Sequence, residues 1–214
     1  RQRVILLLDE IKVIYKKMKS DRMYYTLAIN GGYGGIKGLE AGEGAFISDY
    51  LDLCHVAGLK AGTFKDILRR EGISLDMTAN LSNTMIGGYA PVDRMQLLLR
   101  SLLAVANERT RDDRAFGYYK ECENLALELD EGSFKARMTA IDSIMCPDYR
   151  YSPYKSAGKI TAGFQDKVEG FFEDMSSRMN DGVLVLVGDM DEDRLKKLLS
   201  EYVGGFRTQD VAFR

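Results

Sequence analysis

Small and acidic residues recur on one side of the segment GEGAFISDYLDL, residues 42–53. Ala45, Ser48, Asp49 and Asp52 follow one another at i, i+3, i+4 and i+7, which places them on a single face if the segment is a helix. Apolar residues at a second helical spacing indicate that the same helix also packs against a core. The pattern therefore predicts a packed helix that directs small and acidic side chains toward one place.

Two glutamates further along the chain share one side of a predicted helix. Glu121 and Glu128 are seven residues apart in ECENLALE, so they lie two turns apart on one side of a predicted helix. Carboxylates at this spacing are typical of an ordinary exposed helix surface.

The remaining reactive residues offer little chemistry. His55 is the single histidine and follows Cys54 directly, and neighbours on a helix point about 100° apart, which does not favour a nucleophile and base pair. Cys54, Cys122 and Cys146 have no C-x-x-C spacing, and we predict buried thiols. The glycine-rich stretch NGGYGG matches no phosphate-binding motif, so we expect a turn that uses the backbone freedom of glycine.

Composition excludes several classes of partner. The chain has 214 residues, of which 45% are hydrophobic, and a net charge of −2, so we expect no nucleic-acid partner. The longest apolar run, residues 4–8, is far too short to cross a bilayer, so no membrane span is expected. Residue 1 is Arg rather than Met, which we interpret as a sign of processing or of a longer parent chain. No segment of the sequence assigns a localisation.

Strand and helix signals alternate in a way that favours an α+β fold. We predict a two-layer domain over residues 1–214, with a mainly antiparallel sheet and the helices packed on one face. The predicted strands are residues 4–8, 11–15, 23–29, 73–81, 84–90 and 183–187. The predicted helices are residues 42–53, 63–71, 92–108, 115–128, 132–145 and 161–179, and one more after the N-cap Asp191.

In this order the elements resemble one half of an insulinase/pitrilysin-type zinc metallopeptidase, the family of mitochondrial processing peptidase and its non-catalytic relatives. The resemblance covers nearly the whole chain. A strand pair leads through NGGYGG to the helix that carries the H-x-x-E-H zinc motif in active members. The most specific match is the last stretch, MNDGVLVLVGDMDEDRLKKLLSEYVG, with its strand, Gly-Asp and helix.

Aligned on Phe46, the resemblance places H-x-x-E-H on Ala45, Ser48 and Asp49 of this chain. The two histidine ligands and the general-base glutamate are thereby lost. The resemblance assigns the third, glutamate ligand to Glu128, with Glu121 as its partner in the helix. A catalytic zinc needs about three protein ligands and a water, so we expect no zinc cofactor and no independent peptidase activity.

The resemblance also implies a role for such a half. We expect a catalytically degenerate scaffold or chamber wall beside a second, active half, in the same chain or in another subunit, and a homodimer if the fragment is studied alone. Arg69 matches a substrate-contacting arginine of non-zinc halves, although Leu75 stands where these have a tyrosine. There are two alternatives. One is a hydrolase with a repurposed site of Asp49, Glu121 and Glu128 that holds a metal other than zinc. The other is a stand-alone peptide-binding or structural module.

Overall fold

A six-stranded sheet forms the centre of the computed structural model, which describes residues 4–7, 11–40, 42–60, 62–130, 132–145, 160–173 and 175–202. Its strand order is β1-β2-β8-β3-β6-β5, and every neighbouring pair is antiparallel except β2 and β8. The strands are β1 Val4–Leu7, β2 Lys12–Lys17, β3 Arg22–Asn30, β5 Ser74–Ala79, β6 Asn83–Pro91 and β8 Val183–Gly188. The predicted α+β fold with a mainly antiparallel sheet is confirmed.

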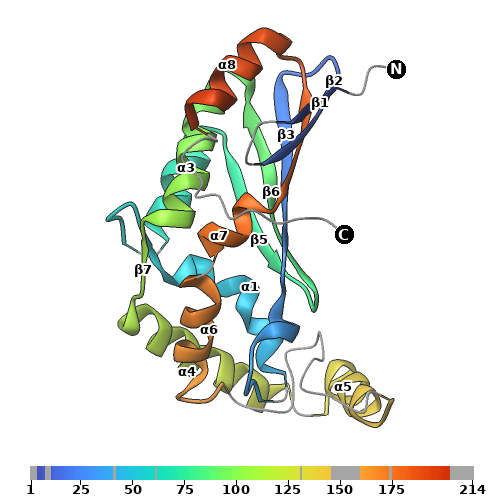
Figure 1. Ribbon diagram of the computed structural model, residues 1–214. Coiled ribbons are helices and arrows are strands. Elements are labelled where there is room, and N and C mark those ends of the chain that lie inside the picture. The colour runs from blue at the N-terminus through green and yellow to red at the C-terminus, as the bar shows by residue number, and fades with distance from the viewer. Residues whose placement is uncertain are drawn as a thin grey trace.

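Alternation along the strands decides which face of the sheet is covered. In β3, Met23, Tyr25, Leu27 and Ile29 are at most 2% exposed, whereas Tyr24 on the other face is 46% exposed. The covering layer contains α3 Met95–Asn107, α7 Met175–Asn180 and α8 Glu192–Tyr202, and Figure 1 shows α3 and α8 side by side along one side of the sheet. α2 Thr63–Arg70 packs beside β5.

Beyond the end of the sheet the helices pack on one another around aromatic rings. α4 Asp113–Leu129 and α6 Phe164–Glu173 enclose α1 Ile47–Tyr50, and α5 Phe134–Met145 lies at the same end of the molecule (Figure 1). The Tyr50 ring lies 6.1 Å from the Phe116 ring and 5.5 Å from the Phe172 ring, measured between centroids. This helical part of the hydrophobic core positions the segment with the spaced acidic residues.

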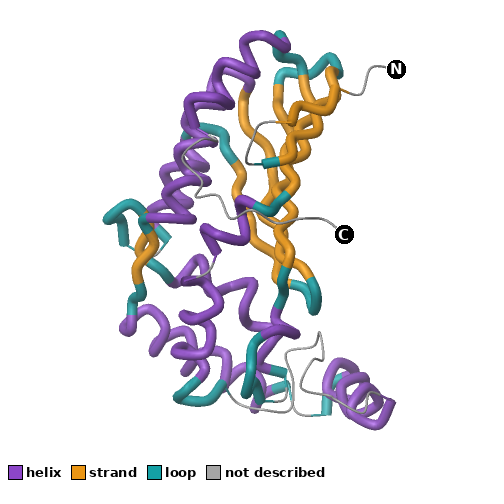
Figure 2. Tube along the Cα trace, in the orientation of Figure 1, coloured by secondary structure: helices purple, strands orange, loops and turns teal. Residues whose placement is uncertain are grey.

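The structure differs from the sequence prediction in several elements. Residues 161–179 form two helices, α6 and α7, instead of one. A short ladder of β4 His55–Val56 and β7 Arg109–Thr110, separate from the main sheet in Figure 2, is absent from the prediction, and β7 lies between the predicted helices 92–108 and 115–128. Residues 146–154 (CPDYRYSPY), between the predicted helices 132–145 and 161–179, and Gly204 and Gly205, after the last helix, lie outside the described residues.

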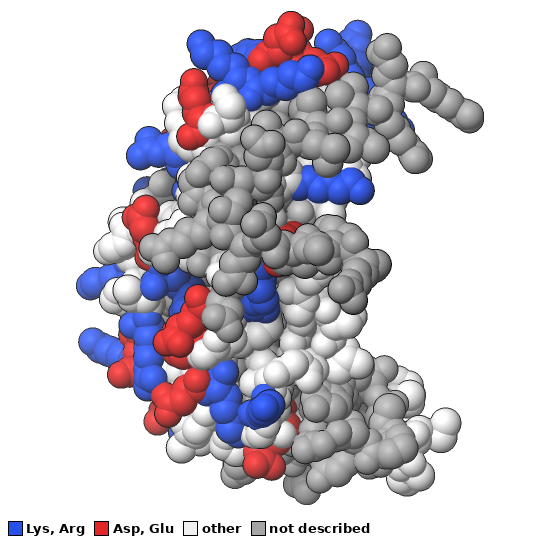
Figure 3. Space-filling model, in the orientation of Figure 1, with Lys and Arg blue, Asp and Glu red and all other residues white. Residues whose placement is uncertain are grey.

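The surface charge and the helix lengths can be compared with the sequence expectations about nucleic acid and membrane. Figure 3 shows Lys and Arg side chains interspersed with Asp and Glu on one face of the molecule, without a continuous field of one sign. Among the residues that the structure describes, no helix combines the length and apolarity that crossing a membrane requires.

Candidate functional site

The segment that should carry the chemistry is a helical run of mixed type. A 3₁₀ turn, Glu43–Phe46, leads into the single α-turn of α1, and a second 3₁₀ turn, Leu51–Leu53, ends the run. Gly42 precedes it with a φ of 77°, a left-handed conformation that glycine adopts without strain. Phe46 and Tyr50 are at most 1% exposed, so the predicted apolar face is buried as expected.

The small and acidic positions of this run do not converge on one place. The Ser48 hydroxyl accepts a hydrogen bond of 2.9 Å from the Ala79 amide at the end of β5. Asp49 accepts a 2.7 Å hydrogen bond from the Tyr119 hydroxyl of α4. Asp52 pairs with Lys65 at 2.7 Å. The three side chains therefore serve three separate packing contacts, to a strand, to α4 and to α2.

Zinc does not fit these positions. Ala45 offers no donor atom, the Ser48 oxygen is engaged by a backbone amide, and Asp49 is bonded to a tyrosine hydroxyl. Burial, followed by the hydrogen bond to Asp49, raises the pKa of Tyr119, so this hydroxyl keeps its proton. No group of three or more potential metal ligands occurs within the described part of the chain.

The resemblance assigned the third zinc ligand to α4, and the carboxylates of this helix can now be located. Glu121 and Glu128 are exposed, and helix geometry puts them about 180–200° around α4 from Tyr119, the residue that reaches Asp49. Glu123 lies about 40° from Tyr119 and is half-buried. Helix geometry therefore directs Glu121 and Glu128 away from the side of α4 that contacts Asp49, so the described contacts give the carboxylate hydrolase no support. Glu123 is the acidic side chain that shares the inner side of α4.

His55 is not on the helical run. It begins β4, and its Nε2 atom lies 2.7 Å from Asp112 Oδ2. Asp112 is also the N-cap of α4, where it accepts a 2.9 Å hydrogen bond from the Ala115 amide. Hydrogen bonds from Ala115 and His55 hold the pKa of Asp112 below its usual value. The one sequence signal for the His55–Asp112 contact is that Asp112 is an acidic residue shortly before the predicted helix 115–128.

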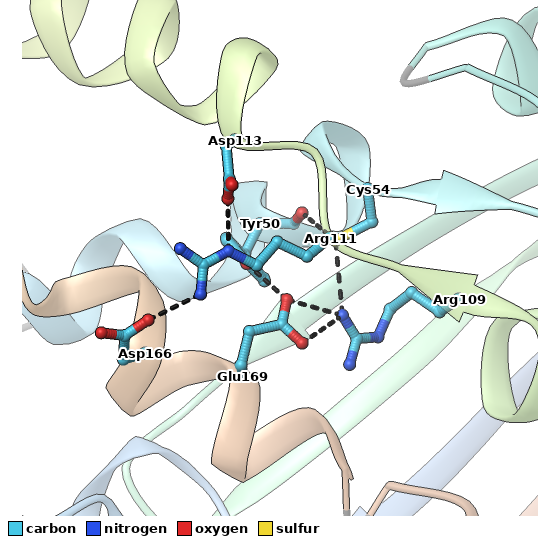
Figure 4. Close-up of polar contacts among 7 residues, drawn as sticks. All are labelled: Tyr50, Cys54, Arg109, Arg111, Asp113, Asp166 and Glu169. Carbon is cyan, nitrogen blue, oxygen red and sulfur yellow. Dashed lines mark hydrogen bonds and ion pairs between the residues drawn. The ribbon is translucent and has the colours of Figure 1, made fainter.

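A buried ion pair that sequence reasoning missed lies behind α1. Figure 4 shows Arg109 from β7 and Glu169 from α6 meeting beside Tyr50 and Cys54. Arg109 Nη1 lies 2.9 and 3.1 Å from the two Glu169 oxygens, and the Tyr50 hydroxyl donates to Glu169 at 2.5 Å. The Arg109 and Glu169 side chains are 7% and 16% exposed. These groups fix the packing of three elements against one another.

This network contains no activated nucleophile. Burial raises the pKa of the Cys54 thiol to about 11 despite the hydrogen bond from Arg109, so the thiol is protonated at neutral pH. Burial and the bond to Glu169 raise the pKa of Tyr50 above its ordinary value. The expectation of buried thiols holds for Cys54 but is wrong for Cys122, which is exposed on α4, and Cys146 lies outside the described residues.

A second buried acid, Glu43, was not singled out from the sequence. Its side chain is fully buried and accepts hydrogen bonds from the Glu40 amide at 2.8 Å and from the Thr161 amide and hydroxyl at 3.0 and 2.5 Å. Burial opposes its ionisation, but these donors and Lys167 outweigh that effect and lower the pKa of Glu43. The carboxylate joins the start of the helical run to the segment before α6.

Arg69, the predicted substrate contact, lies near the end of α2. Its side chain is 76% exposed and forms a 2.8 Å ion pair with Asp66, while Leu75 is buried. Arg69 also lines an open pocket of about 270 Å³ together with Arg22, Lys65 and Tyr89. An exposed ion pair of this kind contributes little to stability, so the guanidinium is available to a ligand.

The structure has the fold that the sequence resemblance implies, and the positions aligned with the zinc motif carry packing contacts. No protein-family model matches the sequence, and neither does any curated protein. Solved structures do match. The inactive domain of an M16 peptidase from Pseudomonas fluorescens superposes with a TM-score of 0.71 at 14% identity, over 96% of this chain and 51% of that one.

Two structures from Escherichia coli match in the same way. The first half of the periplasmic protease PqqL gives a TM-score of 0.73 at 10% identity, over 99% of this chain and 48% of that chain. The structure of PqqL itself gives 0.70 at 15% identity, with 96% of this chain and 23% of that chain covered. The chain therefore has the fold of M16, insulinase-family peptidase half-domains, as the sequence resemblance predicted. It spans about half the length of the first structures that it matches.

Proposed function

We propose that this chain is a catalytically inactive half of an M16-type assembly and forms one wall of a substrate chamber beside a second, active half. Three findings support this role. The chain has the fold of such half-domains, it spans about half the length of matching chains, and one matching structure is itself described as an inactive domain.

The observation that carries the proposal is that the positions aligned with the zinc motif form packing contacts instead. Ser48 and Asp49, which the resemblance aligns with the general base and a zinc ligand, each bind a protein group across the core. In a catalytic zinc site, the ligand side chains bind the metal, and one coordination position stays open for water or substrate. Here the side chains at those positions are committed to holding the helical run against β5 and α4.

The experiment compares the chain alone with the chain joined to an active partner. Homologous halves that carry an intact H-x-x-E-H motif, encoded in the same genome, are co-expressed with it, and peptidase activity is measured with and without a chelator. We expect chelator-sensitive activity from the pair and none from this chain. Activity of the chain alone that disappears in the Asp49→Asn variant would refute the proposal.

Arg69 is the proposed peptide contact of this wall. Its exposed guanidinium and the adjoining pocket could bind an acidic or carbonyl group of an extended peptide. In the active pair, the Arg69→Ala variant should raise KM with little change in kcat, because it removes binding common to the ground and transition states. Arg70→Ala, also at the end of α2 and exposed, is the matched control.

A further inference from the structure

A basic pocket lies where the glycine loop after β3 meets α6 and α7. Its volume is about 350 Å³, within the range of small-molecule sites. Lys37, Lys167 and Arg178 contribute three cations to its lining, and Ile36 and Phe171 contribute apolar surface. No carboxylate belongs to the described lining, although the chain as a whole carries a net charge of −2. The pocket is therefore a local excess of positive charge.

Two glycines of the loop allow close packing beside this pocket. A Cβ atom on Gly32 would lie 2.1 Å from the Asn80 carbonyl oxygen, so the loop packs directly on the turn between β5 and β6. A Cβ on Gly31, whose φ is +95°, would lie 3.2 Å from Arg178 Nη1. The guanidinium of Arg178 thus rests against bare backbone at the edge of the pocket.

The glycine loop does not form a phosphate-binding nest. The amides of Gly31, Tyr33 and Gly34 donate at 2.9–3.1 Å to carbonyls of residues 80–82, and Gly35 donates within the loop. Phosphate loops instead turn their backbone N–H groups toward the ligand. Recognition in this pocket must therefore come from the cationic side chains and the apolar wall.

The three cations differ in how firmly they are held. Arg178 stacks 3.9 Å above the Phe171 ring and donates a hydrogen bond to the Phe171 carbonyl, which fixes its position. Lys167 lies 3.4 Å from Glu43, a carboxylate that already accepts three other hydrogen bonds. Lys37 is exposed and forms no ion pair with any residue of the described ranges. A ligand anion would give Lys37 its counter-charge.

We propose that this pocket binds the C-terminal carboxylate of a peptide, with the side chain of the last residue lying on Phe171 and Ile36. The inference rests on the proposed function, because a chamber wall meets peptides. A peptide terminus presents an anion and an apolar side chain on neighbouring atoms, which matches cations beside an apolar wall. Free phosphate would use the cations alone and leave the apolar wall without a role.

The test measures binding of a fluorescent peptide with a C-terminal leucine to the chain by anisotropy, as the free acid and as the C-terminal amide. We expect the amide to bind at least about tenfold more weakly, since it lacks the charge. Lys37→Glu should weaken binding of the free acid to a similar extent. Lys19→Glu is the matched control, with the same change in net charge in the turn at the opposite end of β3.

Equal affinity for acid and amide, or an unchanged affinity in Lys37→Glu, would overturn the inference. So would displacement of the peptide by inorganic phosphate at concentrations where acetate has no effect, since the pocket would then be an anion site of another kind. The two proposals fail separately. A chain that pairs with an active half but binds both peptides equally loses only the pocket, whereas acid-selective binding without any partner half loses only the chamber role.

Discussion

Ser48 shows how a position aligned with a catalytic base can be used for packing alone. Ser48 is half-buried, and its oxygen accepts the hydrogen bond of the Ala79 backbone amide at the end of β5. Ser48→Ala should lower the free energy of unfolding by about 1–3 kcal/mol, because a buried N–H group is left without an acceptor. Urea unfolding measures this loss.

Ser20 provides the control for that prediction. It accepts a comparable hydrogen bond of 3.1 Å from the Arg22 amide, but at an exposed turn where water can replace it. Ser20→Ala should change the free energy of unfolding by less than about 0.5 kcal/mol. Equal effects of the two substitutions would contradict the role assigned to Ser48.

The inner side of α4 can be identified by restoring zinc ligands. In Ala45→His/Asp49→His, the imidazole introduced at position 49 would face α4, where Glu123 rather than Glu128 lies on the side of Tyr119, and the imidazole at position 45 would lie about one turn before it. We expect measurable zinc binding by calorimetry, and we expect it to be lost on adding Glu123→Gln. Zinc binding that survives Glu123→Gln but is lost with Glu128→Gln would restore the sequence alignment of the third ligand.

At the scale of elements, the helical run is held from both ends by groups distant in sequence. Glu43 ties its start to Thr161, 118 residues away, and Tyr50 ties its end to Glu169 and thereby to Arg109. Removing either Arg109 or Glu169 would leave the other charge buried and uncompensated, so the contact at Tyr50 depends on both. The irregular backbone of the run, with only one α-turn, is therefore stabilised by tertiary contacts rather than by its own helix hydrogen bonds.

Glu43 also predicts a pH dependence. Because its pKa is lower in the folded state than in the unfolded state, its contribution is present above the unfolded value of about 4.3 and is lost as pH falls through the folded pKa. Glu43→Gln should therefore destabilise the protein by about 1–3 kcal/mol at pH 7, and the difference from wild type should shrink below about pH 4.

Urea unfolding of both proteins at several pH values measures this difference. Glu40→Gln is the control, since the Glu40 side chain is exposed and only its backbone amide takes part in the contact. A stability difference between wild type and Glu43→Gln that stays constant down to pH 3 would show that the carboxylate charge is not what stabilises the contact.

At the scale of the whole molecule, the chain should be one part of a pair. Its fold covers about half of several matching chains, and the sheet face opposite the helices leaves Tyr24 partly exposed. We predict that the native protein contains or binds a second domain of similar fold, through an interface larger than roughly 1,000 Å². Light scattering of the chain, alone and mixed with candidate halves, measures the association. A chain that stays monomeric in every mixture would favour the stand-alone binding module.

The sequence by itself determined the order and type of most elements. Alternating apolar residues predicted the strands, as in β3. Gly72 directly follows the predicted helix 63–71, and its φ of 74° in the structure is typical of a glycine that ends a helix. These signals are local: side-chain alternation in a strand and left-handed backbone at a helix end depend on residues only a few positions apart. The order of these elements was enough to identify the M16 half-domain fold.

Only the tertiary structure decided which residues meet. α4 carries a second apolar stripe, in which Tyr118, Leu125 and Leu129 are more than half exposed, so the helical period alone did not reveal its buried side. Packing against α1 selects the side with Tyr119 and thereby turns Glu121 and Glu128 outward. Such contacts depend on how distant elements rotate and dock against one another, and no local sequence pattern encodes that rotation.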